Sequence, residues 1–421
     1  MNKKEYILNT FVRMNLQTYR MLKHSQIPVL CCSLFIATLI SCSSERIEII
    51  EELQIEEFDT ETITVVNPEK EEIPNEVWTE TSNWLGKMQL SNGLLESTEN
   101  GDFVSLYDNA LSALVFTAME KYDKAEAIFD YFDGQIENEL LHGNGGFYAT
   151  RNKQGDHDDR IWMGDNAWLL IALNNYHEAT GSNKYDRLSQ ELELWLRSLQ
   201  DVDGGLFGGQ NVDGTSIHKI TEGIVTAFNA VKGYDDFHKN ILLYLKNERW
   251  DSNEQLLVAW PENPTYKYAL DLHSLGFNIF ENFPTTVLAA ADRYKNTQTS
   301  TLTGEDIIGY CFDEDQDVIW LEGTAQMAVA FQNAGMESEA NLLLEQLEKT
   351  FIKSTTLVNA KGIPYTSNFG TTYGSNELWD HTDITSTISS SAWYLFAKLK
   401  FSPLALGKNK SIPSQDKFWN Q

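Results

Sequence analysis

The feature that most constrains the fold of this chain is a segment repeated six times, which opens with an acidic residue in five of its copies. The six anchor positions are Asp108, Asp165, Glu222, Asp271, Glu322 and Ser390. Each begins a stretch rich in apolar and small residues, and successive anchors lie 57, 57, 49, 51 and 68 residues apart. These spacings are long enough for two helices and two connections per unit. The sequence therefore predicts six consecutive helical hairpins.

Between the anchors runs a second helical pattern, whose apolar residues return on one side only. Residues 185–199 show it, and residues 123–132 and 337–351 repeat it. The expected apolar side of the first of these helices consists of Leu188, Leu192, Leu194, Trp195 and Leu199. Helices that are apolar all round are buried, whereas amphipathic helices lie between core and water. The anchor helices should therefore be inside and the amphipathic ones outside.

Six such hairpins laid side by side can close into a ring. The predicted fold is all-α, an (α/α)6 toroid whose inner helices line a central cleft. Glycine-rich turns follow two outer helices at matching places, residues 91–95 and 203–209, preceded by Gln89 and Gln200. An open solenoid of helical pairs is the alternative, and six repeats favour closure. We expect the toroid to span residues 76–403 and a C-terminal tail to follow at 404–421.

The N-terminus indicates export. Five basic side chains precede an apolar run at residues 27–40, which suits a signal peptide and is too short to span a bilayer comfortably. The basic residues are Lys3, Lys4, Arg13, Arg20 and Lys23. Leu39-Ile40-Ser41-Cys42 then resembles a bacterial lipobox, with Cys42 as the lipid-modified first residue of the mature protein. An ordinary signal peptide cut nearby is the alternative.

These features predict a lipoprotein signal peptide at residues 1–41 and an acidic flexible tether at 42–75. The protein should be an exported, membrane-anchored lipoprotein of the bacterial periplasm or cell surface, with the outer membrane as the expected site. Its contact with the membrane should be through the lipid anchor only.

Charge and cysteine content exclude several classes of function. The formal net charge is -29, and most of it lies in the predicted toroid. Such a body repels phosphate backbones, so nucleic-acid binding is not expected. Of the four cysteines, Cys31 and Cys32 lie in the predicted signal peptide and Cys42 would be acylated, which leaves Cys311. Neither an intramolecular disulfide nor a cysteine metal site is then possible.

If the hairpins run the same way round, the anchor side chains converge at one mouth of the barrel. Hydrolysis of a glycosidic bond needs one carboxylic acid that protonates the leaving oxygen and a second, ionised carboxylate that acts as base or nucleophile. Repulsion and partial burial push the pKa values of neighbouring carboxyl groups apart. The acids therefore indicate an enzyme acting on an oligo- or polysaccharide, and we expect neither a cofactor nor a metal.

Helix capping is the alternative explanation of these acids. Asp and Ser are favoured N-caps, and acids in a first turn are favoured by the helix dipole, so the Asp and Ser anchors could serve stability alone. Glu222 and Glu322 fit this explanation less well, because Glu is a poor N-cap and Thr221 stands ready to cap in front of Glu222. Both are followed by Gly, which lets a ligand or backbone come close. The predicted catalytic residues are Glu222 and Glu322, with Asp165 third.

Aromatic and polar residues near the anchors complete the predicted site. An aromatic ring beside a carboxylate can form a stacking floor for a sugar. Trp162 and Trp320 precede their helices, so they should lie at the mouth, as pocket wall or as packing. Trp168 and Trp393 lie one turn inside and are expected in the core. The predicted substrate-binding residues are Asp108, Asp271, His273, Trp162, Trp320, Tyr107 and Gln326.

Two acidic loops and three histidines give weaker signals. Residues 156–160 could form a metal loop or a substrate-facing loop. Residues 313–317 resemble a calcium loop, but the Gly and terminal Glu of that motif are not at the required spacing. Solvated turns are the favoured explanation for both. His218, His238 and His381 show no ligand spacing, and His381 lies in a stretch that could cover the mouth.

From about residue 76 to 400 the sequence resembles the six-hairpin glycosidase superfamily. The similar segments are Gly164-Asp165-Asn166-Ala167-Trp168, Thr221-Glu222-Gly223, Ala269-Leu270-Asp271 with Ser274, and residues 320–328. The resemblance implies a toroid acting on oligo- or polysaccharide, often with an inverting mechanism. Related exported endo-mannanases carry an Asp-Asp pair before a helix, whereas the nearest pair here, Asp158-Asp159, lies several residues early.

Residues 200–205 also resemble turns of prenyltransferase and terpene-cyclase toroids. Those enzymes need a carbocation cavity or a Cys/His/Asp zinc site, and the single remaining thiol and the predicted export argue against them. Three functions remain, of which a glycoside hydrolase is first. A polysaccharide lyase is second, and an acid-rich mouth disfavours it because uronates are anionic. A non-catalytic glycan-binding lipoprotein is third.

Overall fold

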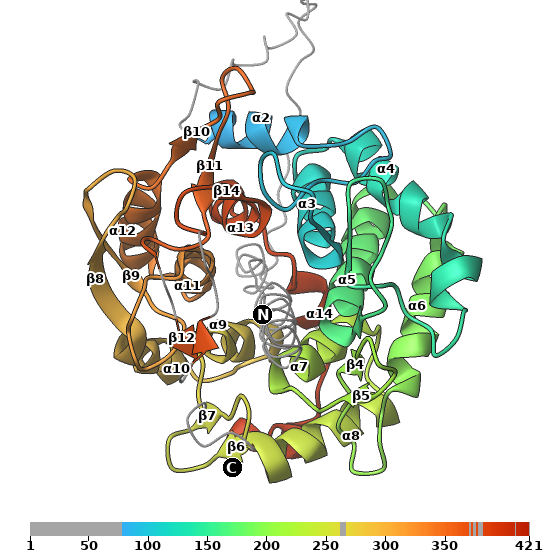
Figure 1. Ribbon diagram of the computed structural model, residues 1–421. Coiled ribbons are helices and arrows are strands. Elements are labelled where there is room, and N and C mark those ends of the chain that lie inside the picture. The colour runs from blue at the N-terminus through green and yellow to red at the C-terminus, as the bar shows by residue number, and fades with distance from the viewer. Residues whose placement is uncertain are drawn as a thin grey trace, which may run out of the picture.

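Helices in two concentric layers make up the body of the molecule (Figure 1). The computed structural model describes residues 78–261, 267–369, 372–373, 376–377, 382–408 and 410–420. The predicted signal peptide, Cys42, the predicted tether and His381 lie outside the described residues. The inner helices are α3 (Leu106–Ala118), α5 (Met163–Thr180), α7 (Thr221–Ala230), α9 (Leu270–Ile279), α11 (Leu321–Asn333) and α13 (Ile388–Leu399). The outer helices are α2 (Thr79–Lys87), α4 (Tyr122–Asp133), α6 (Asp186–Ser198), α8 (Asp236–Tyr244), α10 (Thr286–Ala290) and α12 (Glu337–Glu348).

The inner helices form a closed ring. Each contacts the next along the chain, and the last, α13, contacts the first, α3 (Figure 1). An outer helix stands before each inner one, so the described residues form six helical hairpins. The predicted (α/α)6 toroid is therefore confirmed, and the open solenoid is wrong.

Burial explains the two layers. In α11 every residue from Leu321 to Gln332 is buried, whereas α6 buries one side only, with Leu188, Leu192, Trp195 and Leu196. The prediction for the apolar side of α6 is wrong at Leu194, whose side chain is 62% exposed. Six residues after Leu188, a helix with 3.6 residues per turn has rotated away from the buried side.

The predicted glycine-rich turns are equivalent in atomic detail. Gln89 Nε2 donates to the carbonyl oxygens of Gly93 and Lys124, both at 2.9 Å. Gln200 Nε2 donates in the same way to Gly204 at 3.1 Å and to Phe237 at 2.9 Å. Each glutamine therefore joins its turn to the next outer helix. The glycine in each turn has a positive φ, 92° for Gly93 and 91° for Gly204, which favours that residue.

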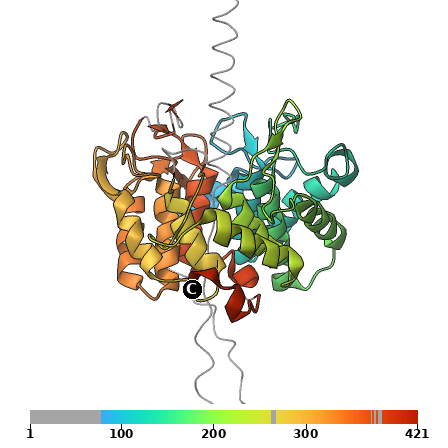
Figure 2. The same cartoon turned by 90° about the horizontal axis from the view of Figure 1, so that it is seen from below.

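Short strands and the C-terminal segment occupy opposite rims of the barrel (Figure 2). The strands are β1 (Val104–Ser105), β2 (Thr150–Arg151), β3 (Ile161–Trp162), β4 (Gly209–Gln210), β5 (Ser216–Ile217), β6 (Trp250–Asp251), β7 (Leu256–Leu257), β8 (Lys295–Thr299), β9 (Asp306–Tyr310), β10 (Ile352–Lys353), β11 (Lys361–Pro364), β12 (Thr372–Tyr373), β13 (Asn376–Glu377) and β14 (Ser386–Thr387). They pair antiparallel, in two-stranded sheets and in the three-stranded sheets β3-β4-β5 and β10-β11-β14. Several end directly before an inner helix, so this rim contains the N-terminal ends of the inner helices.

The C-terminal segment closes the other end of the barrel. Its short helix α14 (Ala405–Lys408) contacts α5, α7 and α9, and Leu404, Ile412, Phe418 and Trp419 are buried. Trp419 packs on Phe280 at the end of α9, with ring centroids 4.9 Å apart. Among the described residues, no helix is both long and apolar enough to cross a membrane.

Candidate active site

Five carboxyl groups occupy the first turns of five consecutive inner helices. They are Asp108 and Asp165, the third residues of α3 and α5, and Glu222, Asp271 and Glu322, the second residues of α7, α9 and α11. None is more than 2% exposed. In α13 the buried residues Ser389 and Ser390 stand at these positions. The five acids lie inside the rim that carries the short strands.

None of the five carboxyl groups caps its helix. The hydroxyl group of Ser105 precedes α3 and accepts from the backbone N–H of Asp108 at 3.4 Å. The cap positions of the other four helices hold Trp162, Ile220, Ala269 and Trp320. Thr221 does not cap α7, because its hydroxyl group donates to the carbonyl oxygen of Val258 at 2.6 Å. None of the carboxyl groups therefore serves as an N-cap. The acids lie two or three residues after the cap position, still in the first turn, where the helix dipole favours them.

The carboxyl groups raise one another's pKa values. Burial is the largest cause for Asp165, Glu222 and Glu322, and it raises each pKa well above its usual range. Asp271, Asp165 and Glu322 raise the pKa of Glu222 further, and Asp108 raises those of Asp165 and Glu322. The couplings run around the ring, so protonation of one member favours ionisation of the next.

Glu322 is held through one of its two oxygens. Oε1 accepts from the hydroxyl group of Tyr107 at 2.8 Å and from Nε2 of Gln326 at 3.3 Å. Trp393 Nε1 donates in turn to the Tyr107 oxygen at 3.0 Å. Burial raises the Glu322 pKa, whereas the nearby hydroxyl groups, Tyr107 first, lower it. The described part of the chain supplies no partner for Oε2. One oxygen is therefore fixed, and the other has no hydrogen-bond partner among the described residues.

Glu222 has fewer donors than Glu322. Its Oε1 accepts from the hydroxyl group of Thr226 at 3.0 Å, and its buried Oε2 has no partner among the described residues. A methyl group placed on Gly164 would lie 3.4 Å from that Oε2 and 3.1 Å from Nε1 of Trp162. Fewer hydrogen bonds therefore lower the pKa of Glu222 than lower that of Glu322, and three acidic neighbours raise it.

A buried guanidinium group accompanies Asp165. Arg160 is 3% exposed and lies over the ring of Trp162, 5.0 Å from its centroid. Burial lowers the pKa of Arg160 to about 10. Burial raises the pKa of Asp165, and Arg160 partly offsets this effect. Asp165 Oδ1 also lacks a partner within the described ranges. Of the three predicted catalytic residues, Asp165 is the one beside a positive charge.

The remaining two acids differ in their partners. Burial raises the pKa of Asp108 to about 7, partly offset by the nearby hydroxyl group of Ser97. Neither carboxyl oxygen of Asp108 has a hydrogen-bond partner in the part of the chain described. Asp271 Oδ1 accepts from the backbone N–H of Leu272 at 2.8 Å.

The two tryptophans that precede acidic helices are buried. Trp162 is 1% exposed and Trp320 is 0% exposed. A methyl group on Gly323 would lie 2.2 Å from the ring of Trp320, and one on Gly223 would lie 2.9 Å from Cε of Met163. The glycines after Glu222 and Glu322 therefore make room for protein side chains rather than for a ligand. Trp168 and Trp393 are core residues, as predicted.

His273 lies apart from the carboxyl groups. Its Nδ1 bonds to the carbonyl oxygen of Val287 at 2.8 Å and its Nε2 to the hydroxyl group of Tyr294 at 3.2 Å. Burial lowers its pKa to about 4. Two residues after Asp271 the helix has turned by more than half a revolution, which directs His273 toward the outer layer. The His273 side chain therefore faces away from the carboxyl groups, and the structure does not support its predicted role in substrate binding.

The other weak signals belong to the rim loops and the outer layer. His157 stacks on Tyr148 with ring centroids 3.8 Å apart, and His218 stacks on Trp260 at 4.3 Å. His238 is buried and bonds to Asp235 at 2.8 Å. Within the described residues, no group of three or more His, Cys, Asp or Glu side chains is arranged to hold a metal ion.

Sequence reasoning missed several neighbours of the acids. Thr226 follows Glu222 by four residues, as Gln326 follows Glu322, so helical spacing could have identified it. Tyr365 reaches Glu322 from a loop, and no local pattern marks it. Arg160, beside Asp165, belongs to the loop 156–160, for which a substrate-facing position was one of the alternatives. Trp393 was identified as core, but its bond to Tyr107 also links it to Glu322.

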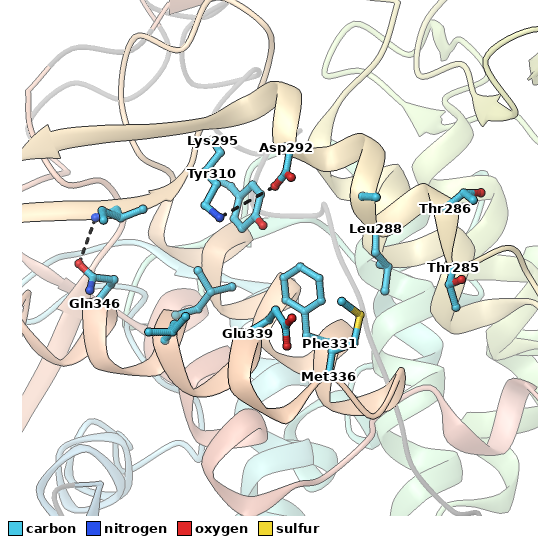
Figure 3. Close-up of a pocket in the computed structure, with 14 residues that line it drawn as sticks. Thr285, Thr286, Leu288, Asp292, Lys295, Tyr310, Phe331, Met336, Glu339 and Gln346 are labelled. Carbon is cyan, nitrogen blue, oxygen red and sulfur yellow. Dashed lines mark hydrogen bonds and ion pairs between the residues drawn. The ribbon is translucent and has the colours of Figure 1, made fainter.

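A cavity of about 640 Å³ lies away from the acids, on the outer wall (Figure 3). It is bounded by α10, α12 and the hairpin β8–β9, and Phe331, Met336, Leu342 and Leu343 are among its lining residues. Helix α10 has five residues and α12 has twelve, so α10 covers a shorter stretch of the wall. Lys295 and Asp292 form an ion pair at its edge, 4.0 Å apart.

Comparisons with known proteins support the fold. No family model and no curated protein sequence matches the chain. A glycosidase solved in complex with glucose matches with a TM-score of 0.53 and 12% identity, over 78% of this chain and 96% of its own. A novel alpha-amylase from Clostridium perfringens matches with a TM-score of 0.54 and 13% identity, over 78% of this chain and 100% of its own. Cellobiose 2-epimerase from Bacillus thermoamylovorans matches with a TM-score of 0.52 and 12% identity, over 77% of this chain and 97% of its own. The predicted likeness to six-hairpin glycosidases is thereby confirmed at the level of the fold.

Proposed function

We propose that this chain is a glycoside hydrolase that cleaves an oligo- or polysaccharide. The observation that carries the proposal is the ring of five buried, coupled carboxyl groups, in which Glu222 and Glu322 each keep one oxygen without a partner among the described residues. A buried carboxyl group left in this way costs stability, so a ligand is the natural partner. The names of the similar structures, which include glycosidases, agree with a carbohydrate ligand.

The environments of Glu222 and Glu322 fit them for opposite roles. Glu222 is buried beside three other acids and has one hydroxyl donor, which favours the protonated acid. Glu322 receives hydrogen bonds from Tyr107 and Gln326, which favour the anion. Glu222 then protonates the glycosidic oxygen as the bond to it breaks, and Glu322 takes a proton from the water that attacks the sugar carbon. Exchange with solvent returns both groups to their starting forms.

Two other reactions on the same fold are less well supported. A lyase needs a base such as tyrosine, but burial and the neighbouring Glu322 raise the pKa of Tyr107 well above its usual range. Epimerisation, the reaction named for one similar structure, needs a base beside a carbonyl carbon. His273 is bonded through both ring nitrogens on the far side of α9. Hydrolysis uses the groups that the mouth provides.

The test is turnover of a glycan panel by the full-length protein and by two variants. We expect wild type to release two shorter saccharides from at least one glycan. Glu222→Gln and Glu322→Gln should each lower kcat by about 100- to 10,000-fold, because each removes one proton-transferring group and keeps the shape of the side chain. Mass spectrometry and chromatography distinguish hydrolysis from epimerisation, which leaves the mass unchanged, and from elimination, which gives an unsaturated product.

Glu348→Gln is the matched control. Glu348 lies on α12 and accepts from Tyr394 at 2.8 Å, away from the ring of acids. The activity of the Glu348→Gln variant should equal that of wild type. Full activity in both Glu222→Gln and Glu322→Gln on the true substrate would contradict the site assignment, and a product of unchanged mass would contradict hydrolysis.

We further propose that the protein is an exported lipoprotein anchored through Cys42. The support is the sequence alone, namely the basic residues, the apolar run and Leu39-Ile40-Ser41-Cys42. Metabolic labelling with a radioactive fatty acid should label wild type and leave Cys42→Ser unlabelled. Equal labelling of both proteins, or none of either, would show that Cys42 is not the anchor.

A further inference from the structure

Two buried polar atoms without partners face one point on helix α5. Trp162 Nε1 and Glu222 Oε2 are both buried and bond to no other group of the described residues. A methyl group on Gly164 would lie 3.1 Å from Nε1 and 3.4 Å from Oε2. One atom is a donor that is always protonated, and the other is a carboxyl oxygen. Glycine at residue 164 is therefore what keeps the two atoms from contact with a side chain.

Contacts with neighbouring residues fix the positions of Trp162 and Glu222. The guanidinium group of Arg160 lies over the Trp162 ring, and Nδ2 of Asn166 donates to the Trp162 carbonyl oxygen at 2.9 Å. Glu222 is fixed by the Thr226 hydroxyl group, which donates to Oε1 at 3.0 Å and leaves Oε2 turned away. Since neither side chain needs to move, the two atoms form a prepared site rather than a chance approach.

Gly164 is not required by the backbone. It is the second residue of α5, and its φ is not in the left-handed region. Alanine suits such a position in a helix better than glycine does. The residue is therefore explained by the space beside it.

A hydroxyl group matches this space chemically. It can accept from the indole N–H and at the same time donate to, or accept from, Glu222, whichever form that carboxyl group has. An ether oxygen cannot donate, and a methyl group can do neither. We propose that Trp162 Nε1, Glu222 Oε2 and Gly164 form a notch that binds one hydroxyl group of the sugar beside the scissile bond. Gly164 then decides which sugars fit.

The inference rests on the proposed function, so its test measures binding and not turnover. The protein is the full-length Glu322→Gln variant, and the probes are α- and β-linked gluco-, manno- and galacto-disaccharides, followed by monodeoxy forms of the tightest binder. Calorimetry should show that Trp162→Phe, which keeps a ring and loses the N–H, weakens binding about tenfold. Gly164→Ala should weaken it by about tenfold or more, because the methyl group fills the notch.

The monodeoxy sugars identify the hydroxyl group. For one of them, Trp162→Phe should cause no further loss, because the group that the indole contacts is already missing. Two matched controls should leave binding unchanged. Trp195→Phe removes an indole N–H that donates to Asn144 on the outer wall. Gly86→Ala adds a methyl group in α2, where it meets only the end of Lys124 at 3.7 Å.

The outcomes separate the notch from the proposed reaction. Binding that falls in Trp162→Phe and Gly164→Ala, with no hydrolysis by wild type, supports the notch and overturns the reaction. Hydrolysis by wild type with unchanged binding in both variants overturns the notch alone. An equal loss for the parent sugar and every monodeoxy form, or no binding by any disaccharide, also overturns the notch. Melting temperatures of Gly164→Ala and Gly86→Ala should equal or exceed that of their parent, which excludes misfolding.

Discussion

The two ends of the toroid differ in the kind of buried polar group that lacks a hydrogen-bond partner. At the C-terminal ends of the inner helices, side-chain amides donate to the backbone they hold. Asn175 donates to Pro403 at 2.9 Å and Asn229 to Leu404 at 3.1 Å. At the mouth, four of the five carboxyl groups keep at least one oxygen without a partner among the described residues. At the closed end, the buried atoms that lack such a partner belong to neutral groups, among them Asn174 Oδ1, Asn278 Nδ2, Ser402 Oγ and Trp419 Nε1.

The difference bears on stability, because a carboxyl group can ionise and the neutral groups of the closed end cannot. A satisfied buried hydrogen bond contributes about 0.5–1.5 kcal/mol, whereas a buried group without a partner costs about 1–3 kcal/mol. The cost is larger for a charged group, so the ionised carboxyl groups of the mouth lower the stability of the fold more than the neutral groups of the closed end do. Natural proteins accept such costs mainly at functional sites. The following variants separate the two ends, beginning with the largest expected effect.

The first prediction concerns Asp108, whose pKa burial raises to about 7. Because the folded-state pKa lies above the usual value, the protonated form stabilises the fold fully at pH 4, and this contribution is lost as pH rises through 7. Asp108→Asn cannot ionise, so at pH 8 it should raise the free energy of unfolding by roughly 4 kcal/mol, and at pH 4 hardly at all. Urea denaturation at both pH values measures this. An equal change at the two pH values would show that ionisation is not the cause.

The second prediction concerns the closed end. A methyl group on Gly407 would lie 2.2 Å from Cγ of Asn229, the residue that holds Leu404. Gly407→Ala should therefore lower the free energy of unfolding by about 1–3 kcal/mol, because the packed side chain has to move. Its kcat should stay that of wild type, because the acids lie at the other end. Gly86→Ala is the control, and a loss of kcat in Gly407→Ala would show that the two ends are coupled.

The sequence predicted the closed ring and its acids because both follow from local patterns. Repeated anchors and one-sided leucines require no knowledge of tertiary contacts. The side of a helix on which a residue lies was predicted less well. Leu194 was expected on the buried side of its helix and His273 beside the acids, and each lies part of a turn away. The loop 156–160 could be considered as substrate-facing, but the approach of its Arg160 to Asp165 could not be predicted from the sequence. The proposed role of Gly164 depends on Glu222, which lies on another helix. A contact between two helices cannot be predicted from the spacing of residues along the chain.

The third prediction tests whether the hydrogen bond from Tyr107 lowers the pKa of Glu322, the proposed base. The Tyr107 hydroxyl group donates to its Oε1 at 2.8 Å and lowers its pKa. Tyr107→Phe should therefore raise the pKa of Glu322 and move the acidic limb of the profile of kcat/KM against pH to higher pH. Activity below the optimum should fall about tenfold. A loss that is equal at all pH values would indicate a structural role only.

The smallest effect is expected from Thr226→Val, which removes the donor to Glu222 Oε1 and preserves the shape of the side chain. This hydrogen bond lowers the pKa of Glu222, so its loss should raise that pKa. Because the proposed role of Glu222 is that of the protonated acid, the basic limb of the profile should move to higher pH, with activity near the optimum changed about threefold or less. Tyr107→Phe and Thr226→Val therefore shift opposite limbs. If Thr226→Val moves the acidic limb and Tyr107→Phe the basic one, Glu222 is the base and Glu322 the acid, and the roles proposed for the mouth are reversed.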